Sequence, residues 1–197
     1  MTGRVYGTAG GSVQSGFAAN ADVAARGAEG ERRTAKILDI LARSGVTVLH
    51  DLNMPGTKYA ANVDHVVVSG DTVTIIDSKV WQGNFYWTVG GATFRGLRRF
   101  KAKTKAGAVT FPAEKRTLPM ARDLLAEHLG IPKSKIKTAL IIWPTGPKPL
   151  STLFFRPPGR PLIVHGPLLT GVVAGVLFGR SQADPRLVSK LARLARR

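Results

Sequence analysis

Two carboxylates and a lysine stand on neighbouring strand-like segments of this chain. Asp64 lies in the segment 62–68, and Asp77 and Lys79 lie in the segment that begins at residue 72. Side chains two positions apart on a strand point to the same face, so Asp77 and Lys79 share one. Clustered carboxylates bind a divalent cation, and a nearby ammonium can orient a water or balance charge on a pentavalent phosphate. This pattern is the skeleton of a metal-dependent nuclease site.

Each of these residues also has a structural interpretation. Asp77 and Lys79 could form a surface ion pair. Asp64 is harder to explain in this way, because it interrupts an apolar strand where an unpaired carboxylate is costly to bury. His65 alternates to the opposite face, which favours a hydrogen-bonding role over a metal-binding one. The indoles of Trp81 and Trp87 fit core or edge packing better than base stacking, but both readings stay open.

The elements that must position this site are predicted from periodicity. An amphipathic helix is expected over residues 29–42, ending at Gly45. Strands follow over residues 46–52, 63–68 and 72–76, with a hairpin turn at 69–71. A second hairpin over 85–94 turns at Gly90 and Gly91. A helix between 112 and 130, a strand over 136–143, a strand over 162–165, an apolar helix over 168–178 and a last helix starting at Asp184 and Pro185 complete the order.

This order predicts an α/β fold, a central mixed sheet flanked by helices. Residues 1–25 read as a flexible leader, 26–165 as the main domain and 166–197 as C-terminal apolar and basic helices docked on it. The last helix could instead lie on a membrane or on DNA. A membrane span over 162–178 is not expected, because His165, Gly166, Pro167 and Thr170 interrupt the apolar run.

Composition bounds the class of protein. The 197 residues, 44% of them hydrophobic, suit a single domain with a full core. The chain has no cysteine, which excludes disulfides, thiolate metal sites and thiol nucleophiles. No apolar segment near the N-terminus resembles a secretory signal, so a cytoplasmic location is expected.

The net charge of +17 is confined to the second half of the chain. Residues 1–90 carry 8 Lys or Arg against 8 Asp or Glu, whereas residues 91–197 carry 21 against 4. A basic field of this size attracts polyanions, and nucleic acid is the foremost candidate partner. A ribosome-facing, solubilising or lipid-facing surface is the alternative. The residues expected to contact phosphates are Arg95, Arg98, Arg99, Lys101, Lys103, Lys105, Lys115, Lys133, Lys135 and Lys137.

Four segments resemble, in order and spacing, the NERD (nuclease-related domain) family of the PD-(D/E)xK restriction-endonuclease-like superfamily. They are GAEGER at 27–32, VLHDL at 48–52, NVDHVVV at 62–68 and IIDSKVWQGN at 75–84. The resemblance implies an αβββαβ core and hydrolysis of DNA phosphodiesters with Mg²⁺ or Mn²⁺, in a bacterial setting. By resemblance, Glu31 is the helix-borne acid, Asp64 and Asp77 are metal ligands together with the Ser78 carbonyl, and Lys79 is the catalytic lysine.

The chain departs from the family pattern at two positions. Lys115 follows Pro112-Ala113-Glu114 where relatives often carry glutamine, and lysine cannot accept a hydrogen bond. Asp77 stands where many relatives have the longer glutamate. Two other functions therefore stay open: a catalytically inactive nucleic-acid-binding module and a peripheral membrane-associated protein. Acceptance of RNA and formation of a homodimer are also open.

Overall fold

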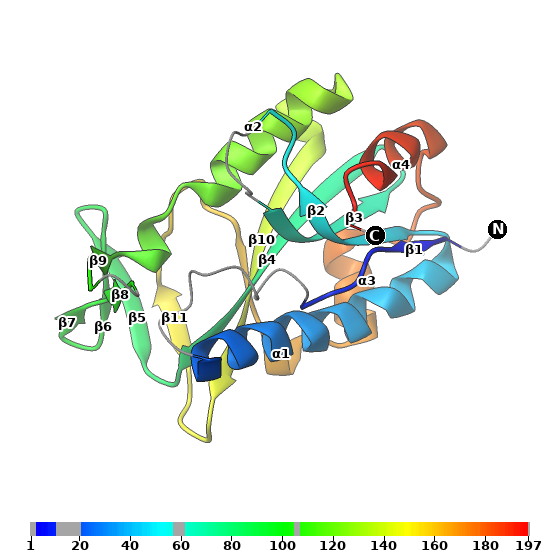
Figure 1. The fold of residues 1–197 in the computed structure, drawn as a ribbon. Coiled ribbons are helices and arrows are strands. Elements are labelled where there is room, and N and C mark those ends of the chain that lie inside the picture. Colours follow the sequence, from blue (N-terminus) through cyan, green and yellow to red (C-terminus); the bar gives the residue numbers. More distant parts are fainter. Residues whose placement is uncertain (1–2, 11–20, 57–61, 105–106, 197) are drawn as a thin grey trace.

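A mixed sheet with helices on both faces forms the body of the protein (Figure 1). The structure, a computed structural model, describes residues 3–10, 21–56, 62–104 and 107–196. Within these residues the main sheet has six strands in the order β1-β2-β3-β4-β10-β12. Their bounds are β1 Val5–Tyr6, β2 Thr47–Asn53, β3 Asn62–Ser69, β4 Thr72–Gln82, β10 Ile136–Thr145 and β12 Leu162–His165. The predicted α/β class is confirmed.

Strands β2, β3 and β4 form an antiparallel meander, and β10 joins it by a parallel crossover. The β3–β4 turn is the predicted hairpin, where Gly70 has φ 58°. A positive φ of this kind carries little steric cost for glycine. Helix α2 (Thr117–Leu129) lies on the crossover connection between β4 and β10 and ends at Gly130, which has φ 70°. Because β10 runs parallel to β4, the two strands lie side by side from Val73 to Gln82.

The N-terminal region differs from the prediction. Helix α1 spans Ala21–Leu38, so it begins before the expected start at residue 29, and a 3₁₀ segment, η2, continues over Asp39–Ser44. Val5 and Tyr6 form β1 and pair with Val48 and Leu49 of β2. The segment 1–25, which the sequence predicts to be a flexible leader, thus contains β1 and the start of α1. Residues 1–2 and 11–20 lie outside the described residues. The alanine-rich start has no apolar periodicity, yet alanine is the strongest helix former.

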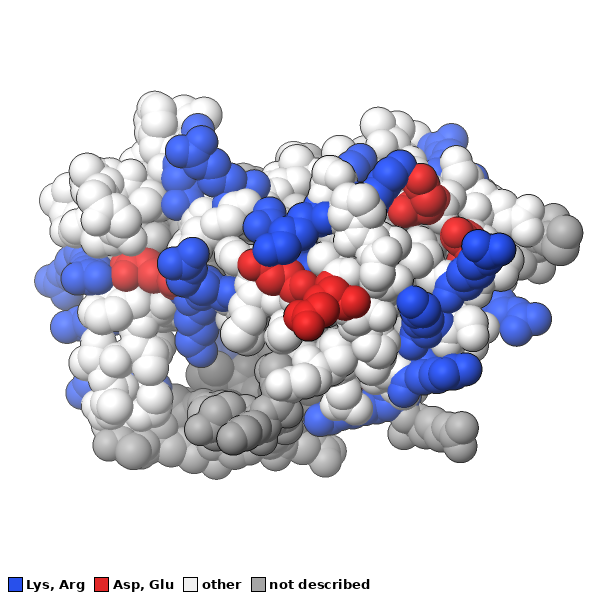
Figure 2. All heavy atoms as spheres, turned by 90° about the horizontal axis from the view of Figure 1, so that it is seen from above, with Lys and Arg blue, Asp and Glu red and all other residues white. Residues whose placement is uncertain are grey.

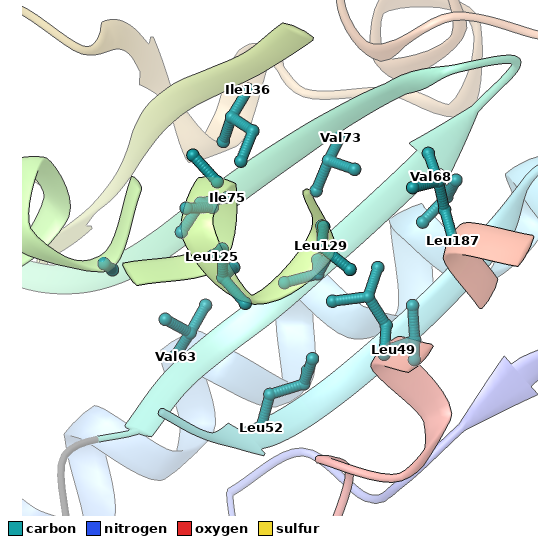
Figure 3. Packing of buried hydrophobic residues seen from close by; sticks show 14 of the residues in the cluster. Leu49, Leu52, Val63, Val68, Val73, Ile75, Leu125, Leu129, Ile136 and Leu187 are labelled. Atoms are coloured by element: carbon teal, nitrogen blue, oxygen red, sulfur yellow. The ribbon is translucent and has the colours of Figure 1, made fainter. Parts of the chain in front are cut away.

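Each face of the main sheet covers its own core. On one face, β2, β3 and β4 pack against α2 and α4, as Figure 3 shows for Leu125, Leu129 and Leu187 above Val63, Val73 and Ile75. On the other face, Leu38 of α1 and Ala174 of α3 (Gly171–Phe178) pack against Val67, Ile76 and Ile141. Two-sided burial explains why the central strands read as nearly continuous apolar runs.

A second, smaller sheet lies at the end of the molecule opposite β1 and α4 (Figure 1). Within the described residues its order is β11-β5-β6-β7, from β11 Ser151–Phe154, β5 Phe85–Val89, β6 Ala92–Arg95 and β7 Arg98–Arg99. The predicted hairpin at Gly90 and Gly91 joins β5 to β6. Short strands β8 Ala102–Lys103 and β9 Val109–Thr110 pair beside it. A third core cluster, around Trp81, Tyr86 and Phe155, fixes this sheet to the main one.

The C-terminal helices pack on the main domain. Helix α4 (Pro185–Ala192) begins as predicted, with the Asp184 side chain accepting a hydrogen bond from the Arg186 N–H at 2.8 Å. Its apolar residues Leu187 and Leu191 are buried in the first core. Short 3₁₀ turns occur at η3 Pro112–Glu114, η4 Lys133–Lys135 and η5 Gly166–Leu168. Among the described residues, no helix has both the length and the hydrophobicity that a membrane crossing requires.

Candidate active site

The two candidate metal ligands lie opposite each other where β3 and β4 separate. The β3–β4 pairing runs from Ser69 opposite Thr72 to His65 opposite Ile76, so the same register places Asp64 opposite Asp77. The backbone pairing of β3 with β4 ends here, and the Ser78 N–H donates instead to the Asp64 carboxylate (Oδ2, 2.8 Å). A side chain thus takes a strand hydrogen bond, and the two strands diverge around the carboxylates.

Asp77 and Lys79 share one face of β4, as their spacing predicts. Lys79 Nζ donates to Asp77 Oδ1 at 2.6 Å, and the two side chains are 38% and 24% exposed. Asp64, Asp77 and Lys79 all line a cavity of about 240 Å³, together with Lys115 and Asn62. The surface ion pair that the sequence left open is thus present, but it lies inside a cleft with a second carboxylate.

Glu31 approaches the same lysine from the other side of the sheet. It is buried on α1 and accepts a hydrogen bond from the Gly10 N–H at 3.0 Å. Close packing of α1 depends on Gly30, because a Cβ there would lie 2.4 Å from a Val80 methyl group. Glu31 and Lys79 both line a second cavity of about 800 Å³, so Lys79 borders both cavities. Glu31 lies in the middle of α1, away from the N-terminus of the helix.

Negative charge exceeds positive charge in this cluster. Burial, and then the neighbouring Asp77 carboxylate, raise the pKa of Asp64 well above its usual range. Burial also raises the pKa of Glu31. For Lys79, burial acts to lower the pKa, but the fields of Asp77, Asp64 and Glu31 outweigh it and the pKa is raised. The cluster therefore holds a charged ammonium and more carboxylate than that ammonium neutralises.

A buried polar network supports the site from behind. Ser78 turns its side chain away from the cleft and donates to Thr34 Oγ1 of α1 at 2.9 Å. Trp143 of β10 donates to the same oxygen at 3.0 Å, so Thr34 ties α1 to both central strands. The Ser78 carbonyl remains near the site, 3.4 Å from Lys79 Nζ.

The two histidines play the structural part that the sequence favours for His65. His65 is fully buried, and its Nδ1 lies 2.8 Å from His50 Nδ1. His50 Nε2 in turn contacts Asp39 Oδ1 at 2.9 Å. Burial lowers the pKa of His65 well below its usual range, and His50 adds to the effect. The pair faces away from the cavity that Asp64 and Asp77 line.

The structure adds neighbours that the sequence did not single out. Asp51 has φ 49°, which is strained for a residue other than glycine, and it accepts a hydrogen bond from Asn62 Nδ2 at 2.8 Å. Arg26, Gln82 and Lys148 line the larger cavity beside Lys79. Asn62 stands in a quoted motif, whereas Arg26 and Lys148 carry no local signal. Arg26 and Lys148 come close to Lys79 because α1 and the loop after β10 both lie beside β4 in the tertiary structure.

The predicted phosphate-contacting residues separate into two groups. Arg95, Arg98, Arg99, Lys101 and Lys103 lie on or beside β6–β8, and Lys115 lines the smaller cavity. Lys133, Lys135 and Lys137 instead lie at the start of β10, where Lys133 pairs with Asp123 and Lys135 with Asp71. Lys105 lies outside the described residues. Figure 2, in which the molecule is seen from above, shows Lys and Arg side chains spread over that side with acidic side chains between them.

The strand arrangement, the paired carboxylates and the lysine between two cavities define an α/β domain of nuclease-like fold. A family model described as the nuclease-related domain, NERD, matches residues 26–140, more than half of the chain. The protein belongs to this family. The comparison with curated proteins and the comparison with solved structures gave no match.

Proposed function

We propose that this protein is a metal-dependent nuclease that hydrolyses DNA phosphodiester bonds. The observation that carries the proposal is the arrangement of Asp64, Asp77 and Lys79, which lie on adjacent strands and line one cavity. Membership of a nuclease-related family supports it. Glu31 beside the same lysine completes the set of residues that the resemblance implies.

The donor set fits Mg²⁺ or Mn²⁺. Asp64, Asp77 and the Ser78 carbonyl offer oxygen atoms alone, which hard divalent cations prefer. Burial, and then the neighbouring Asp77 carboxylate, raise the pKa of Asp64, and a bound cation would favour the ionised carboxylate. Among the described residues no three His, Cys, Asp or Glu side chains surround a common point as a closed metal cage would require. Mg²⁺ keeps several waters and is bound through one or two carboxylates, a number that Asp64 and Asp77 would supply.

When bound, such a cation would supply Lewis-acid charge at a phosphoryl oxygen and lower the pKa of a bound water. Lys79 would act as a fixed cation and not as a base, because its raised pKa keeps it protonated. Its ammonium, held by Asp77, would orient water and stabilise charge that develops on phosphate. Glu31 would hold this ammonium in place from the larger cavity.

Backbone contacts would provide most of the affinity for DNA. Lys115 lines the carboxylate cavity, and the exposed cations of β6–β8 lie on the same half of the molecule. Contacts of this type bind phosphates in a salt-dependent and largely sequence-tolerant way. RNA as a substrate and a homodimeric form are further outcomes for the same assay.

Plasmid cleavage tests the proposal. Supercoiled plasmid is incubated with Mg²⁺ or Mn²⁺ and with the wild type, Asp77→Asn or Lys79→Gln. Each variant should cut about 100-fold more slowly or worse, because each removes an interaction made with the transition state. Matched controls are Asp71→Asn and Lys36→Gln, which change the same residue types at exposed positions away from both cavities. If the wild type cuts no faster than Asp77→Asn while still binding DNA, the chain is an inactive nucleic-acid-binding module.

A further inference from the structure

The outer face of the small sheet carries a row of aromatic side chains. Phe85 and Trp87 alternate with the buried Tyr86 on β5, and Phe154 on β11 alternates with the buried Phe155. Trp87 is the register partner of Phe94 on β6 and of Phe154 on β11. Phe85, Trp87, Phe94 and Phe154, which we call the aromatic face, therefore lie side by side across three strands.

These four rings are not part of the core. The inner face of the sheet is occupied by Tyr86 and Phe155, which contact Trp81 in the third core cluster. Phe85 and Phe154, by contrast, are 38% and 58% exposed. Exposed aromatic side chains grouped on one surface are uncommon and mark binding sites.

The rings are held in fixed positions. Trp87 and Phe94 are stacked, with ring centroids 4.8 Å apart and an angle of 25° between the ring planes. The Trp87 indole N–H also donates to the Gly96 carbonyl at 2.8 Å. Phe85 and Phe154 meet edge to face at 6.3 Å. A preformed surface of this kind loses little side-chain entropy when a planar ligand stacks on it.

The charge around the aromatic face selects a polyanion. Segments 83–117 and 146–161 together carry 11 Lys or Arg and a single acid, Glu114. Within the described chain, Arg98, Lys101 and Lys103 are exposed and form no ion pair. A second copy of this chain would bring the same excess positive charge against it, which disfavours self-association through this face.

We propose that the aromatic face binds single-stranded nucleic acid by stacking unpaired bases, while the surrounding cations hold the phosphates. Small four-stranded sheets that present aromatic side chains stack two or three bases in this way. Duplex bases are already stacked on each other, so the face distinguishes single strands from duplexes. This inference rests on the proposed function, because it names the substrate class of the same site.

The small sheet that carries the aromatic face follows directly in sequence on the strand that carries Lys79. Strand β4 continues from Lys79 to Gln82, and β5 starts at Phe85, so extended chain of about 20 Å or less separates the lysine from the first ring. The larger cavity is lined by Lys79, Gln82 and Lys148. Close packing at Gly83, where a Cβ would lie 2.1 Å from the Lys148 carbonyl oxygen, connects this cavity to the small sheet.

Binding is measured by fluorescence anisotropy in EDTA, so that no cleavage occurs. The probes are a thymidine oligonucleotide of about 20 nucleotides, an abasic strand of the same length and a duplex. The double variant Phe85→Ala with Phe154→Ala should bind the thymidine strand about 10-fold more weakly or worse. Its affinities for the abasic strand and the duplex should match the wild type, and the salt dependence should not change. Val172→Ala with Val176→Ala, which alters exposed apolar residues of α3, is the matched control.

Two results would overturn the inference. One is unchanged affinity of the double variant for the thymidine strand, with circular dichroism showing a native fold. The other is a wild-type dimer in sedimentation that the double variant abolishes, which would make the face a self-association surface. Binding is measured in EDTA, so its result does not depend on catalysis. A protein that fails to cut plasmid but still prefers single strands would refute the nuclease proposal and leave the stacking proposal intact.

Discussion

Asp64→Asn should stabilise the metal-free protein while it abolishes the proposed nuclease activity. The ionised Asp64 carboxylate is disfavoured by burial and by Asp77, and Lys79 compensates only in part. Asparagine keeps the shape of the side chain, and its amide oxygen can still accept the Ser78 N–H that now donates at 2.8 Å. The substitution therefore removes the charge without removing the strand hydrogen bond.

The magnitude follows from the sign of the pKa shift. The folded pKa of Asp64 is raised, so between the unfolded pKa of about 3.9 and the folded pKa the native state binds more protons. Across that window wild-type stability falls by about 1.4 kcal/mol for each pH unit as pH rises. The variant lacks this loss. Its advantage should be absent below about pH 3.9, grow through the window and stay constant above the folded pKa.

Calorimetry or thermal melting in EDTA from pH 4 to pH 8 provides the assay, and each kcal/mol corresponds to ~2–4 °C in a protein of this size. Mg²⁺ at 100 times its dissociation constant should then add about 2.7 kcal/mol to the wild type and much less to the variant. Asp71→Asn is the control, since Lys135 lowers the pKa of that exposed carboxylate and no gain is expected. A variant less stable than wild type at pH 8, or an advantage independent of pH, would refute the reasoning.

Four further outcomes are expected. Gly30→Ala should lower the melting temperature, because the new methyl group overlaps the Val80 side chain, and Val80→Ala in the same chain should restore much of the loss; an undisturbed single variant would contradict this packing. Leu191→Ala should cost about 2–5 kcal/mol in denaturant unfolding, since the side chain is fully buried; a cost near zero would mean that α4 does not belong to the core. Asp184→Ala should cost about 1 kcal/mol through loss of the helix cap, with Asp184→Asn nearly neutral. The His65 ring should stay neutral by nitrogen NMR at pH 5, and this contributes to stability that declines as pH falls below the unfolded pKa of about 6.5, because the unfolded chain then takes up the proton; a protonated ring at pH 5 in the folded protein would disprove it.

Local signals predicted the elements around the site well. The Ser69–Thr72 turn, the run of β-branched residues on either side and the alternation of Asp77 with Lys79 lead directly to the β3–β4 hairpin. The start of α4 was also evident, because Asp184 followed by Pro185 satisfies helix capping by itself. These features depend on residues close together in the sequence, so the tertiary structure has little to add to them.

Other features depended on contacts between distant segments. Nothing local indicates that Val5 and Tyr6 pair with β2, because a two-residue strand exists only where an edge is available. The separation of the basic residues also depends on such contacts. The lysine-rich segments that contain Lys133 and Lys135 and that contain Lys101 and Lys103 look alike in sequence, but the start of β10 lies at the opposite end of β4 from the small sheet. Trp87 could be core or platform by sequence, and the packing of Tyr86 and Phe155 on the inner face placed it on the outer one.

The sequence by itself determined the chemistry that this protein can offer: two carboxylates on adjacent strands, a lysine two positions after the second, and a positive field restricted to residues 91–197. Periodicity assigns side chains to faces, and the hairpin sets the register that opposes Asp64 and Asp77. Only the tertiary structure decided how that chemistry is tuned. The raised pKa values of Asp64 and Lys79 arise from burial and from the fields of neighbouring charges, and the exposure of the aromatic face arises from packing on its inner side. All of these depend on distances between residues far apart in the chain.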